Sequence, residues 1–380
     1  MSFQDDPRLA EAKTLPIEGV IERLGIAGLV RTGSEFIGPC PLCGGRDRFG
    51  INRRSLLFQC RQCGMKGGDQ VALVREVMGL SFPDALGWLC GDRPAAVDPK
   101  EFERRQAAAR RAEQKRREDA EKYRRKAINH ARQTWAQAER FRGSEEAQQL
   151  LRGYLASRGL GPERLAGLPD TLLCIPDHPY VRKIAGENIT LHRGPCMIAA
   201  APSMRDQLDA VHQTWFSAEP PHRKVKIVHE GKDFPAKMVR GSLKGGAIRL
   251  HKPEGADTLI MGEGIETTLS AMVANVLPRA AFWAGVSLGN MSGWMQKVQG
   301  TRHSGLPDMT DTEAFLPPPW VRRLIFIQDG DSDPKATRAK LESGLRRAMA
   351  MRPGLKAQIV HAGEGVDLND VLCRDPKEEN

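Results

Sequence analysis

The chain has 380 residues, of which 27% are charged and 40% are hydrophobic, a composition typical of soluble globular proteins with two or three domains. Its net charge of +10 favours a polyanionic partner, without separating nucleic acid from an anionic membrane surface. No apolar run approaches the roughly 18 residues of a membrane-spanning helix, and the first residues lack the basic-then-apolar order of a signal peptide. The sequence therefore predicts a cytoplasmic protein without a membrane partner.

Two Cys-x2-Cys pairs, separated by sixteen residues, lie between two stretches of helical apolar spacing, at about residues 14–30 and 69–90. Two residues between thiolates allow both sulfurs to reach one tetrahedral ion. No histidine precedes His130, so we expect one zinc ion with four thiolate ligands and no open position, which is the composition of a structural site. The expected ligands are Cys40, Cys43, Cys60 and Cys63.

Basic side chains alternate with aromatic side chains between these cysteine pairs. Phe49 and Phe58 have two interpretations: they form the small core of the ribbon, or they stack on the bases of single-stranded DNA. Arginines in this pattern suit the phosphate backbone of a nucleic acid. We expect DNA contacts from Arg46, Arg48, Arg53 and Arg54.

The motifs CPLC, DRF and FQCRQCGMKGGDQVALV resemble the zinc-ribbon domain of DnaG-type bacterial and phage primases. Many members of that family use a histidine as one zinc ligand, whereas this chain resembles the all-cysteine version of some phage primase-helicases. The resemblance implies a DNA-binding zinc-ribbon domain over residues 1–95.

Residues 96–144 differ in composition from the sequence on either side. From residue 98 to residue 142 the chain has 15 Lys and Arg against 8 Asp and Glu, a difference of +7, with no Gly and no Pro after Pro99. The abundance of Ala, Arg, Glu, Lys and Gln favours a helix, and the scarcity of apolar residues indicates that this helix is exposed. The segment is either a solvated helical linker or a contact for nucleic acid.

Short strand-like runs between Gly and Pro breaks predict an α+β region over residues 145–256. From residue 257 onward, TLIMGEG, AAFWAGV, RRLIFIQ and KAQIVHA have the apolar content of buried strands, separated by helical patterns and one Pro-rich insertion. This alternation predicts an α/β domain over residues 257–380, with a parallel sheet covered by helices.

Three carboxylates follow two of these expected strands. Glu263 ends the first strand, between Gly262 and Gly264, and Asp329 and Asp331 end the third. The carboxyl ends of parallel strands line the ligand crevice of an α/β sheet. Carboxylates that meet there repel one another unless a cation lies between them, and Mg²⁺ prefers oxygen ligands, so the pattern predicts a magnesium site.

A fourth carboxylate, Asp333, has two interpretations. Because Pro334 follows it, Asp333 suits the N-cap of a helix that begins at Pro334. Its position two residues after Asp331 also makes Asp333 a candidate magnesium ligand. The pattern Asp-x-Asp-x-Asp opens EF-hand calcium loops too, but that loop needs Gly at its sixth position and Glu at its twelfth, where this chain has Pro334 and Lys340.

IMGEGIETTLSA and FIQDGD resemble the Toprim domain, which is shared by DnaG-type primases, type IA and II topoisomerases, OLD-type nucleases and RecR. The resemblance is strongest to primases of phages, plasmids and integrative elements. It implies that Glu263, Asp329 and Asp331 hold two Mg²⁺ or Mn²⁺ ions for nucleotidyl transfer, with Glu263 also serving as a general acid or base. EGVDLNDVL resembles the family ending GKDxND through Asp367 and Asp370, although its lysine is absent here.

LDAVHQTWFSAE and FPAKMVRGSLKGGAIRL resemble the region that precedes Toprim in the same primases. Here Lys237, Lys244 and Arg249 are candidates to bind the nucleotide triphosphate or the template, or else belong to a solvated basic face. The expected function is a DNA primase that makes short RNA primers from ribonucleoside triphosphates on single-stranded DNA, for a phage or mobile element. The chain has no P-loop, so the replicative helicase would be a separate partner. The alternatives are a Toprim nuclease and a non-catalytic, RecR-like DNA-binding protein.

Overall fold

The computed structural model of the chain describes residues 6–91, 99–275, 277–296, 298, 301, 303–328, 333–361 and 368–369. The chain divides into two compact units, residues 1–123 with 183–189 and residues 124–182 with 190–380. Among the described residues, no helix combines the length and the apolar content needed to span a bilayer. The division of the chain into four segments remains a prediction.

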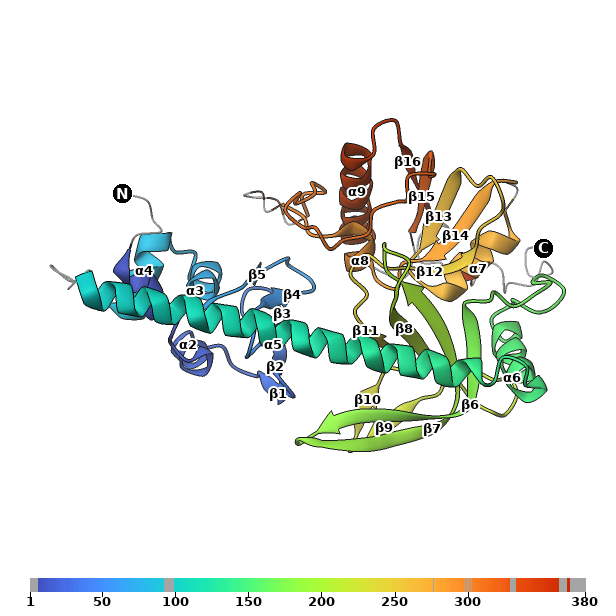
Figure 1. The fold of residues 1–380 in the computed structure, drawn as a ribbon, viewed down its shortest axis with the longest axis horizontal. Coiled ribbons are helices and arrows are strands. Elements are labelled where there is room, and N and C mark those ends of the chain that lie inside the picture. Colours follow the sequence, from blue (N-terminus) through green and yellow to red (C-terminus); the bar gives the residue numbers. More distant parts are fainter. Residues whose placement is uncertain are drawn as a thin grey trace. The chain divides into compact units, whose positions relative to one another are not determined.

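The first unit contains an antiparallel sheet of five strands in the order β1-β2-β3-β4-β5 (Figure 1). The strands are β1 (Val30–Thr32), β2 (Glu35–Cys40), β3 (Gly44–Asn52), β4 (Phe58–Cys60) and β5 (Lys66–Gly67). The helices before and after the sheet are α1 (Pro7–Ala12), α2 (Ile17–Arg23), α3 (Gln70–Met78) and α4 (Phe82–Cys90). Asp69 starts α3 by accepting a hydrogen bond from the Ala72 N–H at 2.8 Å, which satisfies one of the free amides of the first turn.

The core of the first unit includes both aromatic rings of the ribbon. Phe49 is fully buried and Phe58 is 3% exposed, with 6.2 Å between their ring centroids. They belong to one apolar cluster with Val71 and Leu73 of α3. The interpretation of the two rings as core residues is therefore confirmed, and neither ring is accessible for stacking on a base.

The expected basic helix is α5 (Pro99–Glu139), the long teal helix of Figure 1. Within the second unit, Ala131, Trp135 and Ala138 recur at helical spacing and pack into an apolar cluster with strand residues such as Ile198 and Trp215. The described side chains of residues 103–122 include no buried one. Tertiary packing thus holds the C-terminal part of α5, whereas helix-forming composition favours its N-terminal part.

The second unit continues with α6 (Glu145–Ala156) and two small sheets. The larger one has the order β11-β8-β7-β6, in which β8 pairs antiparallel with both β7 and β11. Its strands are β6 (Leu172–Ile184), β7 (Glu187–Pro202), β8 (Leu208–Trp215) and β11 (Lys237–Gly241). The smaller one is an antiparallel pair, β9 (Ile227–His229) and β10 (Lys232–Phe234).

A five-stranded sheet in the order β12-β14-β13-β15-β16 carries the predicted carboxylates. The strands are β12 (Ile248–His251), β13 (Thr258–Gly262), β14 (Ala280–Ala284), β15 (Arg323–Gln328) and β16 (Lys356–His361). The pairs of β13 with β14, β13 with β15 and β15 with β16 are parallel, and β12 pairs antiparallel with β14. The expected mixed α/β fold with a parallel-containing sheet is confirmed. β12 comes from the segment expected to belong to the middle region, yet it forms one edge of this sheet.

Helices cover both faces of this sheet: α7 (Ile265–Val273) lies on one face, and α8 (Leu288–Ser292) and α9 (Pro334–Met351) lie on the other (Figure 1). Successive residues of β13 therefore point to different helices. Leu259 and Met261 belong to the apolar cluster that includes Leu341 of α9, whereas Ile260 belongs to the cluster that includes Met272 of α7. Burial on both faces explains why these strands read as continuous apolar runs.

Candidate functional site

The four predicted cysteine ligands lie together in the first unit. Their sulfur atoms all lie within 4.8 Å of one another, and the Sγ atoms of the pairs Cys40–Cys63 and Cys43–Cys60 are 3.6 Å apart. Cys40 ends β2 and Cys60 ends β4. A tight turn after each strand leads to the second cysteine of the same Cys-x2-Cys pair, Cys43 or Cys63. This arrangement could hold a single metal ion with four sulfur ligands.

The backbone of both turns suits thiolate ligands. Gly44 and Gly64, which follow the second cysteine of each pair, have φ of 67° and 76°, as expected for turns that favour glycine. Amide groups point at the sulfur of Cys60, because the N–H groups of Gln62 and Cys63 donate to it at 3.4 and 3.5 Å. Burial raises the pKa of the Cys60 thiol, but these donors outweigh burial and lower its pKa below the ordinary value.

The predicted DNA-contacting arginines of the ribbon divide into two kinds. Arg53 is already engaged, since its Nη2 lies 2.5 Å from Glu18 Oε1 and its guanidinium lies over the Phe36 ring at 5.4 Å. Arg46, Arg48 and Arg54 are exposed. A contact with a phosphate backbone thus stays a prediction for all four, and for Arg53 it would compete with an existing ion pair.

The strands that precede the predicted magnesium ligands are direct neighbours. β13 pairs parallel with β15, with Met261 opposite Phe326, so both strands end at the same edge of the sheet. Glu263 follows β13, and its backbone oxygen accepts a hydrogen bond from the Val286 N–H at 2.9 Å, which fixes the strand end against the chain after β14. Asp329 follows β15 directly in the sequence; Asp329 and Asp331 lie outside the described residues.

The glycine before Glu263 has a packing role that the sequence did not reveal. A Cβ at Gly262 would lie 2.8 Å from Thr268 Oγ1 of α7, closer than such contacts occur. A Cβ at Gly264 would meet only Thr267 Oγ1 at 3.5 Å and Glu266 Oε2 at 3.7 Å, which are ordinary contacts. Gly262 thus lets α7 pack closely on the end of β13.

Asp333 caps the helix that begins at Pro334. Its Oδ1 accepts hydrogen bonds from the backbone N–H groups of Lys335 and Ala336, both at 3.1 Å. The cap interpretation is confirmed, and one carboxylate oxygen is engaged in this role. A magnesium-ligand role for Asp333 stays a prediction.

Replacing Asp333 by Asn separates the two roles, because asparagine caps a helix about as well as aspartate but carries no charge. We expect Asp333→Asn to leave the unfolding midpoint unchanged and Asp333→Ala to cost about 1 kcal/mol, as measured by urea denaturation. Metal-dependent activity that survives in Asp333→Asn would assign the residue to the cap alone. Activity that Asp333→Asn abolishes, with stability intact, would make it a metal ligand as well.

A buried ionic cluster that the sequence analysis missed centres on Glu266, three residues after Glu263. Glu266 of α7 is 4% exposed, and its carboxylate accepts a hydrogen bond from Tyr154 Oη at 2.5 Å. The ammonium groups of Lys224 and Lys237 lie 2.6 and 3.4 Å from the same carboxylate. Lys237, a predicted nucleotide or template contact, is therefore held by an acidic partner within the fold.

The charges of this cluster shift one another's pKa values. Burial alone would raise the pKa of Glu266, but Lys237 and Lys224 outweigh burial and hold it well below its usual range. Burial lowers the pKa of Lys224 to about 8, against the attraction of Glu266. Burial, together with the Glu266 charge, raises the pKa of Tyr154, so the phenol stays protonated and donates.

Removing the Glu266 charge should destabilise the second unit. Glu266→Gln leaves two ammonium groups without their anion, and breaking a buried pair in this way costs about 3–5 kcal/mol. The lysine side chains are 31% and 40% exposed, so we expect the lower end, about 3 kcal/mol, in urea denaturation at pH 7. Glu254→Gln, an exposed control, should change stability by less than about 0.5 kcal/mol.

The contribution of the Glu266 charge to stability should depend on pH, and the direction of the pKa shift decides whether it is lost in acid or in base. Because the pKa of Glu266 is lower in the folded chain than its ordinary value of 4.5, its stabilisation is fully present above about pH 4.5 and is lost as the pH falls. The difference in stability between wild type and Glu266→Gln should therefore narrow in acid. An equal difference at pH 7 and pH 3 would contradict this assignment.

The other two predicted basic contacts also have acidic partners. Lys244 forms an ion pair with Glu313, and Arg249 Nη2 lies 2.6 Å from Asp206 Oδ1. The Arg249 guanidinium also lies over the Trp283 ring, 4.8 Å from its centroid. The three predicted residues thus pair with three different carboxylates, and a role in phosphate binding stays a prediction for each.

One described residue of the C-terminal motif, Asn369, is anchored on α7. Asn369 is fully buried, and its Nδ2 donates to Ser270 Oγ at 3.0 Å and to the Arg158 backbone oxygen at 2.6 Å. Asp367 and Asp370, the two residues of this motif singled out from the sequence, lie outside the described residues. Asn369 of this motif thus packs on the helix that follows Glu263.

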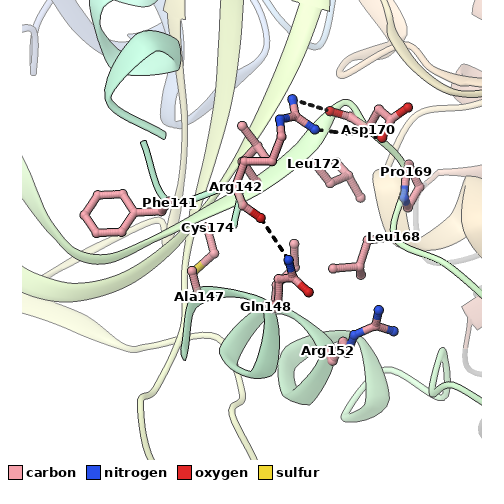
Figure 2. A pocket seen from close by; sticks show the side chains of 12 residues that line it. Phe141, Arg142, Ala147, Gln148, Arg152, Leu168, Pro169, Asp170, Leu172 and Cys174 are labelled. Carbon is pink, nitrogen blue, oxygen red and sulfur yellow. Dashed lines mark hydrogen bonds and ion pairs between the residues drawn. The ribbon is translucent and has the colours of Figure 1, made fainter. Parts of the chain in front are cut away.

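A pocket of about 280 Å³ lies between α6 and the chain that leads into β6 (Figure 2). Arg142 borders it and forms an ion pair with Asp170 at 3.8 Å, while Gln148 Nε2 donates to the Arg142 backbone oxygen at 2.8 Å. Leu151 and Leu172 supply part of its apolar lining. None of the predicted site residues that the structure describes lines this pocket.

Comparison with known proteins gives a family match and distant structural likenesses. Residues 125–250 match the model of a domain of unknown function, DUF7146. A DNA primase domain from Pseudomonas aeruginosa is similar at 14% identity and a TM-score of 0.38, over 64% of this chain and 74% of that one. The primase fragment of the bacteriophage T7 primase-helicase protein is similar at 12% identity and a TM-score of 0.30, over 88% of this chain and 92% of that one. Both TM-scores are too low to carry an argument, so the assignment of function rests on this chain's own residues.

Proposed function

We propose that this protein is a DNA primase of the Toprim type, which makes short RNA primers on single-stranded DNA. The observation that carries the proposal is the shared edge of β13 and β15, since Glu263 follows one strand and Asp329 and Asp331 follow its parallel neighbour. Carboxylates that converge at the carboxyl edge of a sheet suit hard divalent cations. The four-cysteine cluster in the first unit supports the proposal, because it fits a zinc ribbon.

In this proposal Glu263, Asp329 and Asp331 hold two Mg²⁺ or Mn²⁺ ions, with Asp333 as a further candidate ligand. When bound, such ions activate the attacking hydroxyl and neutralise charge on the leaving pyrophosphate. The chain's own basic groups would bind the substrates. Lys237, positioned by Glu266, would attract the triphosphate, while Arg46, Arg48 and Arg54 would contact the template.

The zinc ion would be structural, and its four ligands would be those of the cysteine cluster. The partners of the protein would be single-stranded template, ribonucleoside triphosphates and a separate replicative helicase, in the replication of a phage or mobile element. The four segments would be a zinc ribbon (1–95), a basic helical linker (96–144), the N-terminal part of the polymerase core (145–256) and a Toprim domain (257–380).

A template-dependent assay tests the proposal directly. The full-length protein, loaded with zinc, is incubated with single-stranded DNA of mixed sequence, four ribonucleoside triphosphates and Mg²⁺, with and without a replicative helicase. We expect short RNA products that require template and Mg²⁺. Absence of products on every template with helicase present would overturn the proposal. DNA nicking that needs Mg²⁺ but no nucleotides would instead identify a nuclease that uses the same carboxylates.

A further inference from the structure

Four basic side chains form a stripe along the N-terminal part of α5. They are spaced 7, 4 and 7 residues apart, and because an α-helix has 3.6 residues per turn, this spacing keeps them on one side of the helix. All four are exposed. The basic stripe consists of Arg104, Arg111, Lys115 and Lys122.

The stripe lies on the side of α5 that points away from its apolar contacts. Projected with 3.6 residues per turn, its members lie opposite the buried Ala131 and Ala138 and about 120° from the buried Ile128 and Thr134 of the same helix. A rise of 1.5 Å per residue makes the stripe about 27 Å long from first to last member. The stripe is therefore a linear row of charge, and its side chains take no part in the apolar packing of α5.

The stripe does not stabilise the helix through ion pairs recorded for the described part of the chain. Arg117, on another side of α5, pairs with Glu113 at 2.6 Å, and Arg132 pairs with Asp209 at 3.1 Å. Within the described residues, no hydrogen bond or ion pair involves the side chain of a member of the stripe. Arg111 and Lys115, four residues apart, repel each other, which costs the helix a few tenths of a kcal/mol.

Two acidic residues lie close to the stripe. Glu118 lies between Lys115 and Lys122 on the same side, and it accepts a hydrogen bond from Gln114 Nε2 at 2.9 Å. Asp119, four residues after Lys115 and three residues before Lys122, is exposed as well, so the stripe keeps a net charge of +2 when both acidic residues are counted with its four basic members. An elongated, unpaired row of this sign is complementary to the phosphate backbone of a nucleic acid.

We propose that the basic stripe of α5 binds the phosphate backbone of a nucleic acid strand without reading its sequence. The inference rests on the proposed function and deepens it, because it names a second template-binding surface. This surface lies outside the zinc ribbon and outside the carboxylate edge, which is the end of β13 and β15 that Glu263, Asp329 and Asp331 follow. The straight helix presents its charges at intervals of about 10, 6 and 10 Å along its axis, which lets several phosphates of one strand be neutralised together. Such contacts position a strand and leave base recognition to other residues.

The test replaces all four stripe residues by Gln in the full-length protein. Gln has nearly the helix propensity of Lys and Arg, so circular dichroism should show unchanged helix content. Binding of labelled oligothymidylate is measured without nucleotides between about 50 and 200 mM salt. Each lost contact lowers the steepness of log K against log salt by about 0.7, so we expect a decrease of roughly 2 to 3 and at least about a tenfold loss of affinity at low salt.

A matched control removes four positive charges that are exposed but already paired. Arg117, Arg142, Arg193 and Arg338 have carboxylate partners at 2.6, 2.7, 2.7 and 2.9 Å, and their replacement by Gln changes the net charge equally. We expect this variant to keep most of the salt dependence. Glu118→Gln should bind the oligonucleotide more tightly than wild type, because it removes an acidic charge that repels the phosphate backbone.

The outcomes separate the stripe from the proposed function. Equal losses in the stripe variant and the control would show that only net charge matters and would overturn the proposal, as would an unchanged salt dependence in the stripe variant. Loss of binding to phosphatidylserine vesicles, with oligothymidylate binding intact, would assign the stripe to a membrane surface and overturn it too. A parallel titration with duplex DNA shows whether the stripe binds the backbone of single-stranded or of duplex nucleic acid. These binding measurements do not depend on primer synthesis. A protein that makes no primers would overturn the proposed function and leave the result for the stripe unaffected.

Discussion

Glu263→Gln should reduce primer synthesis by at least about 10³-fold while single-stranded DNA binding persists. The amide keeps the shape of the carboxylate but lacks the charge that a hard divalent cation requires. Loss of the charge stabilisation that a metal supplies is worth several kcal/mol, and about 4 kcal/mol corresponds to a thousandfold in rate. Primer yield on a defined template and DNA binding, measured on the same preparation, check the two halves of the prediction.

Glu254→Gln is the matched control for this experiment. Glu254 is exposed and lies in the turn before β13, at the opposite end of the strand from Glu263. The control should synthesise primers at the wild-type rate. Wild-type synthesis in Glu263→Gln would reject the carboxylate edge as the catalytic centre.

The remaining carboxylates should act with Glu263 as one unit. We expect Asp329→Asn and Asp331→Asn each to reduce synthesis about as strongly as Glu263→Gln. The combination of Glu263→Gln with Asp331→Asn should be little worse than either change alone, because residues that share a metal are strongly non-additive. Additive losses would show that the residues contribute at separate places, which would contradict a shared metal site.

Local patterns explain the predictions that the structure confirms. The two knuckles each span a few residues, so their spacing alone was enough to predict that the four sulfurs meet. Asp333 and Pro334 are adjacent in the sequence, and the cap they form needs no distant partner. The apolar runs of β13 and β15 predicted buried parallel strands because both faces of their sheet are covered.

Contacts between distant residues explain what the sequence could not predict. Glu266 meets Tyr154, 112 residues earlier, and Lys237, 29 residues earlier, and no local pattern connects them. Its position three residues after Glu263 was visible, but a carboxylate in the first turn of a helix is ordinary. The acidic partners of Lys244 and Arg249, and the antiparallel edge strand β12, likewise depend on the tertiary fold.

Cys60→Ser should remove the zinc ion and unfold the first unit. Structural zinc supplies roughly 10 kcal/mol or more of apparent folding free energy in small zinc peptides, because the site does not exist in the unfolded chain. Here the cluster joins the ends of β2 and β4 to the turns that lead into β3 and β5, so the small sheet depends on it. Metal analysis should find one zinc per wild-type chain and less than about a tenth of that in the variant.

Cys90→Ser is the control, since Cys90 lies in the same unit outside the cluster, where its sulfur is 3.6 Å from the Arg8 backbone oxygen. It should keep its zinc. A folded wild-type first unit that contains no metal would refute the site.

The loss of folded structure in Cys60→Ser should stay confined to the first unit. The variant therefore separates the role of the zinc ribbon from the role of the carboxylates in the second unit. The apolar clusters of the second unit include none of the four cysteines, so thermal unfolding of Cys60→Ser should lose one transition and keep the other. Template binding by the ribbon arginines would be lost with the first unit, whereas the carboxylate edge would persist. We therefore expect Cys60→Ser to synthesise few primers and yet to retain Mg²⁺ binding by isothermal calorimetry, which Glu263→Gln should weaken in the same assay.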